Sequence, residues 1–122
     1  MKEYKTTPEQ FELFKKYVNY YIIEFNLFDW AVYFELKRLD DCQARCSTDI
    51  KSRVVTFSLG IQIYYTSDED IKNCALHEVC HLLIADISDL AYKRSVTFDQ
   101  IEQAAETVTR RIQALLKRRT RW

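Results

Sequence analysis

The chain contains very little glycine and proline, with one of each in 122 residues. So few turn-forming residues cannot supply the connections of a many-stranded sandwich or barrel, and such all-β architectures are excluded. Apolar residues make up 48% of the sequence and aromatic residues 14%, which suffices for a packed core and excludes a disordered chain. We therefore expect one α+β domain over residues 1–122, built from long helices and a small sheet.

Long apolar runs and an excess of charge are also missing. No run approaches the roughly 18 to 20 apolar residues that span a bilayer, and MKEYKTTPEQ contains no apolar stretch typical of a secretory signal. The 18 basic and 18 acidic residues cancel, which argues against binding polyanions over the whole surface. We expect a cytoplasmic protein with no membrane partner. Its cysteines are then reduced thiols, packed as small apolar side chains or binding metal: Cys42, Cys46, Cys74 and Cys80.

Capping residues and apolar periodicity predict three helices. A capping box and apolar residues at helical spacing predict the first helix over residues 8–25. A hydroxyl followed by acidic residues at 66–69 predicts the start of a second helix, which ends near Ala85. After a loop over 86–97, a last helix begins near Phe98. Its apolar residues recur at spacings of three and four: Ile101, Ala105, Val108, Ile112 and Leu115.

The segment between the first two helices is typical of strands. Residues 30–39 and 54–59 are rich in aromatic and β-branched side chains, and residues 43–47 are consistent with a shorter strand between them. Polar residues connect the three segments over short distances. Short connections favour an antiparallel meander, so we expect a three-stranded antiparallel sheet.

The second helix contains both histidines of the chain, in the motif HExxH at residues 77–81. Residues four apart lie one turn apart on the same helix face, so His77 and His81 can bind one metal ion together. Glu78 then lies beside the metal without binding it, where it can accept a proton from a water molecule. The alternative is that His77 and His81 are ordinary helix residues that pair with nearby carboxylates.

A third metal ligand must come from a residue other than histidine. Glu102 and Glu106 lie one turn apart on the last helix, and at about 100° per residue Glu102 is nearer the apolar side chains. Either glutamate can equally be a solvated surface residue. Cys74 shares the helix face of His77 and His81, but cysteine is usually packed at such a position. The residues alone leave the choice open.

These features resemble the zincin metallopeptidases, specifically the gluzincins, in which a downstream glutamate follows HExxH. The sequence is similar from residue 30 onward to very small HExxH proteins of phages and prophages, including the minimal gluzincins. The resemblance rests on VVTFSL, HEVCHLLIA and VTFDQIEQAAETVTRRIQALL. In such proteins the late helix carries a glutamate shortly before an apolar-x-x-x-apolar step, which Glu106 matches ahead of Val108 and Ile112. The resemblance therefore implies Zn²⁺ bound by His77, His81 and Glu106.

The resemblance also implies an activity. It indicates a minimal zinc-dependent endopeptidase that hydrolyses a peptide or protein substrate, with Glu78 as the general base, in the host cytosol if the chain is phage-encoded. The strand over residues 54–59 is then the edge that receives an extended peptide. Candidates for the group that stabilises the oxyanion are Tyr64, Tyr65 and Tyr92.

Two other functions are consistent with the sequence. The small size favours a non-proteolytic zinc-binding phage accessory or interaction protein. Basic residues at the C-terminal end suggest a weak nucleic-acid contact, or alternatively a solvated helix face: Arg110, Arg111, Lys117, Arg118, Arg119 and Arg121.

Overall fold

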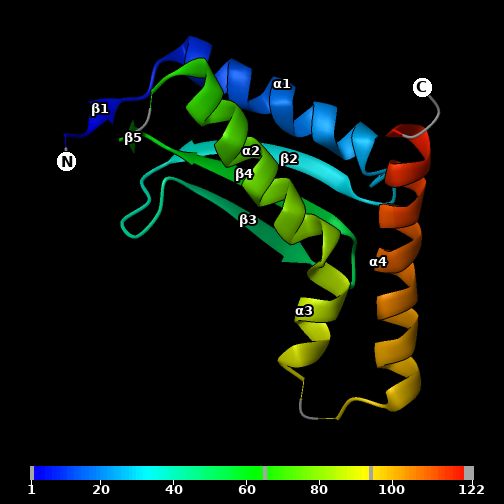
Figure 1. Cartoon of the computed structure of the whole chain (residues 1–122). Coiled ribbons are helices and arrows are strands. Elements are labelled where there is room, and N and C mark those ends of the chain that lie inside the picture. Colours follow the sequence, from blue (N-terminus) through cyan, green and yellow to red (C-terminus); the bar gives the residue numbers. More distant parts are fainter. Residues whose placement is uncertain (1, 65, 94, 120–122) are drawn as a thin grey trace.

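The computed structural model describes residues 2–64, 66–93 and 95–119, with side chains described through residue 115. The chain forms helices and two small sheets, which confirms the α+β class. Figure 1 shows α1 and α2 lying across the larger sheet, α3 continuing from α2, and α4 running back beside α3. The elements are β1 (Tyr4–Lys5), α1 (Pro8–Glu24), β2 (Ala31–Lys37), β3 (Ala44–Asp49), β4 (Val54–Gly60), β5 (Gln62–Ile63), α2 (Asp68–Leu83), α3 (Ala85–Ala91) and α4 (Phe98–Arg119).

The helix starts follow the predicted capping signals. The Thr7 hydroxyl accepts a hydrogen bond from the Gln10 backbone at 3.1 Å, and the Gln10 side chain accepts one from the Thr7 backbone. Ser67 and Asp70 form the same reciprocal pair at the start of α2. Each pair satisfies backbone N–H groups that have no partner inside the helix. The predicted starts of α1 at Pro8 and of α4 near Phe98 are confirmed.

The loop predicted over residues 86–97 is partly wrong, because α3 occupies the first half of it. The helix that carries HExxH, α2, ends at Leu83. Ile84 departs from helical geometry, and the short helix α3 begins at Ala85. Asp86 of α3 forms an ion pair with Arg53 on the turn between β3 and β4. This long-range contact stabilises helical geometry in a segment without strong local helix signals.

The predicted antiparallel meander is also wrong. The strand order is β2-β4-β3, in which β4 pairs parallel to β2 and antiparallel to β3. The connection over residues 38–43 carries the chain past the position that β4 later fills. β4 takes the central position because Val55, Phe57 and Ser58 are all fully buried, so both faces of the strand are covered.

This topology changes which strand has a free edge. Residues 54–59 form most of the central strand, so the prediction that they receive a peptide is wrong. The edges of this sheet are β2 and β3, and it is β3 that packs next to α2. The core lies between the sheet and the two helices, where Phe14 and Val18 of α1 meet Ala75 and Val79 of α2.

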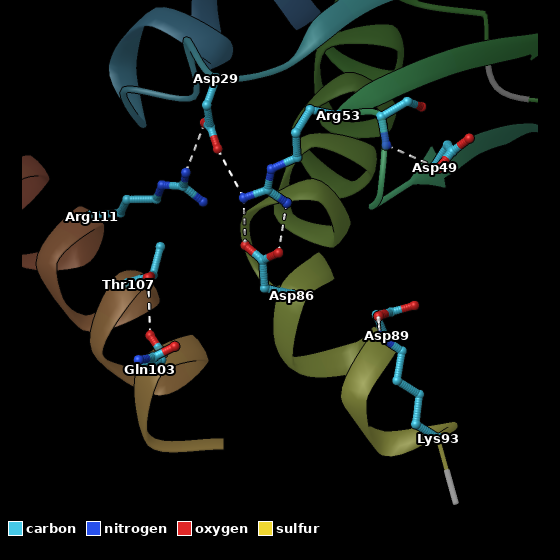
Figure 2. Close-up of polar contacts among 10 residues, drawn as sticks. Asp29, Asp49, Arg53, Asp86, Asp89, Lys93, Gln103, Thr107 and Arg111 are labelled. Atoms are coloured by element: carbon cyan, nitrogen blue, oxygen red, sulfur yellow. Dashed lines mark hydrogen bonds and ion pairs between the residues drawn. The ribbon is translucent and has the colours of Figure 1, made fainter. Parts of the chain in front are cut away.

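An ionic cluster joins α3 and α4 to the rest of the chain (Figure 2). The Arg53 guanidinium donates to both carboxylate oxygens of Asp86, at 2.6 and 3.1 Å, and to Asp29 at 3.0 Å. Asp29 also accepts a hydrogen bond from Arg111 of α4 at 2.8 Å. Paired hydrogen bonds of this kind are stronger than those between neutral groups. The cluster therefore fixes the rotation of α4 about its own axis relative to the rest of the chain.

The apolar residues predicted to form the packing seam of α4 are only partly buried. Val108 is 7% exposed, but Ile101 and Ile112 are 49% and 43% exposed and Ala105 is also exposed. Ala104, outside the predicted seam, is buried instead. None of the helices in the described part of the chain combines the length and apolar character needed to cross a membrane.

Candidate metal centre

The two histidines lie together on the exposed side of α2. Their Nε2 atoms are 3.2 Å apart, and the ring planes cross at 80°. The opposite side of the helix is held in the core by Ala75 and Val79, both fully buried. Burial of that side therefore orients both imidazoles outward, as the four-residue spacing predicts.

The geometry of the imidazole pair fits a single zinc ion. Tetrahedral zinc with Zn–N distances of about 2.05 Å holds two nitrogen ligands about 3.4 Å apart. The observed Nε2–Nε2 distance is 3.2 Å. A hydrogen bond between the rings of His77 and His81 has a similar length, and it requires one ring to donate and the other to accept. If the pair is a zinc site, the chain binds one metal ion per molecule. If the rings are joined by a hydrogen bond, it binds none.

Glu78 lies on the side of α2 that faces β3. It is 8% exposed, and its carboxylate accepts a hydrogen bond from the backbone of Cys46. Burial raises the pKa of Glu78 above its ordinary value, although His77, His81 and the Cys46 hydrogen bond act in the opposite direction. A carboxylate with a raised pKa holds a proton more readily, which suits a general base. Glu78 lines the same groove as His77 and His81.

A groove runs past the motif along β3. One part has a volume of about 670 Å³ and lies between β3, the motif and α3. Ser88 and Asp89 of α3 line it, together with Tyr92 directly after α3. A second part, of about 800 Å³, extends toward the loop before β3. Both parts contain His77 and Glu78. The motif therefore lies at the middle of an elongated groove.

The structure does not bring the predicted third ligand to the histidines. Glu102 and Glu106 are exposed. Each lies about 160° to 200° around the α4 axis from Ala104, which is buried against the rest of the chain. The charged partner of Glu106 is Arg110, at 3.9 Å. Within residues 2–64, 66–93 and 95–115, no three His, Cys, Asp or Glu side chains converge. The assignment of Glu106 therefore stays a prediction.

The cysteines are less buried than the sequence predicts. Cys42 and Cys80 are exposed, while Cys46 and Cys74 are half-buried, and all four are free thiols. Burial, with a smaller contribution from Glu78, raises the pKa of Cys46 to about 12. Burial likewise raises the pKa of Cys74 above its ordinary value. Burial therefore makes both thiols harder to ionise than an ordinary cysteine.

The candidates for oxyanion stabilisation are placed unequally. Tyr92 is 90% exposed at the α3 wall of the groove, and Tyr64 lines the other part, where a hydrogen bond with Glu3 raises its pKa. Tyr65 lies outside the described residues. Sequence reasoning missed Arg45 of β3, which lines the groove and forms an ion pair with Asp41 at 2.9 Å. Its position in a strand beside the motif became apparent only from the sheet topology.

Part of the basic C-terminal end is used within the fold. Arg111 is 12% exposed and donates to Asp29, so its guanidinium is not available to a nucleic acid. Arg110 is exposed on the outer side of α4. The side chains of residues 117–119 and Arg121 lie outside the described part of the structure. A nucleic-acid contact stays a prediction.

Comparisons with known proteins give one structural similarity. No protein-family model matches the chain, and a comparison with curated proteins finds no match. The chain is similar to the crystal structure of the metallopeptidase zymogen of Methanocaldococcus jannaschii jannalysin, with 18% sequence identity and a TM-score of 0.46. The similarity covers 92% of this chain and 96% of that one.

Proposed function

We propose that this protein is a zinc-dependent metallopeptidase that cleaves an extended peptide segment. The observation that carries the proposal is the pair of Nε2 atoms 3.2 Å apart in a groove, with the buried carboxylate of Glu78 beside them. A pair of imidazoles and an adjacent acid form the working part of an HExxH zinc site. A purely structural zinc site needs no such acid and uses four protein ligands.

Each residue of the motif has a separate role in this proposal. His77 and His81 would hold the metal through their Nε2 atoms, which lie 3.2 Å apart. When bound, zinc supplies a Lewis acid that lowers the pKa of a water molecule toward neutrality. Glu78 would accept a proton from a water molecule as its oxygen adds to the peptide carbonyl, and would donate that proton to the amine nitrogen as the C–N bond breaks. The hydrogen bond from the Cys46 backbone would help to hold the Glu78 carboxylate in place.

We assign substrate binding to the edge of β3. β3 pairs with β4 on one side, and its other side borders the groove that contains the motif. An edge strand presents backbone N–H and C=O groups that pair with an added strand. A peptide extended along β3 would pass the two histidines, so its carbonyl groups would come within reach of a metal held there. This assignment replaces the predicted edge at residues 54–59.

Zinc content tests the metal site directly. We expect wild-type protein to bind about one zinc per chain, and His77→Ala and His81→Ala each to lower the affinity by at least about 100-fold, because two ligands are too few for a stable tetrahedral site. Atomic absorption after dialysis and competition with a zinc-binding dye measure both quantities. Asn73→Ala, one turn before His77 on α2, is the matched control and should bind zinc like the wild type. Zinc-free wild-type protein would instead support the hydrogen bond between the rings.

The third ligand requires a separate comparison. We propose Glu106 in this role, so Glu106→Ala should weaken zinc binding by about 10-fold or more, while Glu102→Ala should have little effect. Because both side chains face away from the body, zinc binding by Glu106 requires α4 to rotate. Hydrogen exchange along α4 should therefore differ between the zinc-loaded and zinc-free protein. Loss of zinc from Glu102→Ala alone would transfer the role to Glu102.

A further inference from the structure

The two parts of the groove differ in charge. The larger part is lined by acidic side chains and, in the portion of the chain that the structure describes, by no lysine or arginine. Its carboxylates come from the N-terminal segment, the loop before β3 and α2: Glu3, Asp40, Asp41, Asp70 and Glu78. The smaller part contains Arg45, and its Asp89 is paired with Lys93 at 2.9 Å. The negative charge of the groove is therefore concentrated in the larger part, the acidic end.

Two carboxylates of the acidic end have no cationic partner among the described residues. Asp70 is half-buried, and its carboxylate accepts a hydrogen bond from a backbone N–H at 3.4 Å. Glu3 accepts a hydrogen bond from the Tyr64 hydroxyl. Asp40 and Asp41 instead pair with arginines close by in the sequence. Because a concave surface focuses the field of its charges, Asp70 and Glu3 attract a cationic side chain that enters the groove.

The acidic end is continuous with two features that point to a peptide independently of its charge. His77 of the imidazole pair lines both parts of the groove. Ala44, the first residue of the edge strand β3, also lines both parts. An added strand pairs slightly more stably in antiparallel orientation. Since β3 leads away from the acidic end, an antiparallel peptide leads toward it, and the residues that follow the cleaved bond would lie there.

The length of the acidic end indicates which substrate residues it would contact. Asp70 precedes His77 by about two turns of α2, or about 10 Å. An extended peptide covers this distance in about three residues. Lysine and arginine also carry their charge on a long aliphatic stem, which can lie along the groove wall while the charge reaches a carboxylate. A basic residue within about three positions after the cleaved bond would therefore reach the acidic end.

We propose that the groove selects peptides with a lysine or arginine within about three residues after the cleaved bond, and that Asp70 and Glu3 determine this specificity. Neither residue takes part in the chemical step, because both act on a side chain away from the cleaved bond. The inference rests on the proposed function, since it names the substrate class of the same groove. Charge selection during binding needs no metal, however, so the two proposals can fail separately.

Cleavage of a mixed peptide library, with mass spectrometry of the new termini, tests the selection. We expect lysine and arginine to be enriched about 5-fold or more over aspartate and glutamate after the cleaved bond. Asp70→Asn combined with Glu3→Gln should remove most of this enrichment and raise KM for a lysine-containing peptide about 10-fold, with little change in kcat. Asp68→Asn combined with Glu69→Gln removes the same charge from exposed positions that do not line the groove, and should keep the enrichment. Circular dichroism shows whether both variants fold.

Peptide binding to the metal-free protein separates this inference from the proposed function. Fluorescence anisotropy compares two labelled alanine-rich peptides of equal length, one with lysines and one with glutamates in the C-terminal half. We expect the lysine peptide to bind about 10-fold more tightly or better at low salt, and added NaCl to reduce the difference by screening. This preference without any cleavage would support the charge selection and contradict only the proposed function. Equal binding of the two peptides, enrichment of basic residues before the cleaved bond, or a preference unaffected by the Asp70 and Glu3 changes would overturn the inference.

Discussion

Replacing Glu78 by glutamine should lower kcat for peptide hydrolysis by about 10²- to 10⁴-fold without changing the zinc content of the protein. The amide has nearly the same size as the carboxylate and accepts the same hydrogen bond from the Cys46 backbone. It has no basicity, however, so it cannot take the proton from water. His77 and His81 are unchanged, and the metal site should therefore stay intact. Cleavage of a mixed peptide library, followed by mass spectrometry, measures the loss.

The same Glu-to-Gln change near the start of α2 provides the control. Glu69 lies in the first turn of the helix, exposed to solvent, and Glu69→Gln should leave both kcat and zinc content unchanged. Full activity in Glu78→Gln would remove Glu78 from the mechanism. Wild-type protein that binds zinc but cleaves no peptide would support the alternative of a non-proteolytic zinc-binding protein.

Phe57→Ala should lower the free energy of unfolding by about 3 to 5 kcal/mol, the range typical of a buried phenylalanine removed from a core. Phe57 is fully buried in the central strand, where its ring stacks on Phe34 of β2 with centroids 6.0 Å apart. It pairs with Cys46 of β3 on the other side. Truncation leaves a cavity between the sheet and the helices, so the strand that borders the motif loses its support.

Urea denaturation measures this effect, and the slope m should stay unchanged because the surface exposed on unfolding is nearly the same. Phe28→Ala is the matched control, because Phe28 is 65% exposed and its removal should change stability by less than about 0.5 kcal/mol. A loss of less than about 1 kcal/mol for Phe57→Ala would show that β4 is not the centre of the core.

Features that depend on neighbouring residues could be predicted from the sequence. The capping boxes at Thr7 and Ser67 act over three residues, and the positions of α1 and α2 follow from them. The spacing of His77 and His81 places both rings on one helix face in any α-helix. The apolar repeat of α4 correctly identified Val108 as a packing residue, but it included Ile101 and Ile112, which are exposed, and left out Ala104, which is buried.

Strand pairing could not be predicted in the same way. Residues 54–59 are apolar enough for a central strand, but short connections favoured a simple meander. Whether β2 and β4 pair directly depends on the path of residues 38–43 and on burial of both faces of β4. α3 was missed for a related reason, because the Asp86–Arg53 contact that stabilises it joins residues far apart in the sequence.

The sequence by itself determined the helix that carries HExxH, the acid beside its first histidine and the repeat on the last helix, since each depends on contacts within one or two turns. Only the tertiary structure decided that β3 borders the motif and that Glu102 and Glu106 face away from it. Rotation of α4 about its axis is set by the Arg111–Asp29 ion pair and by burial of Ala104 and Val108. These interactions join distant segments, and their outcome depends on how the whole chain packs.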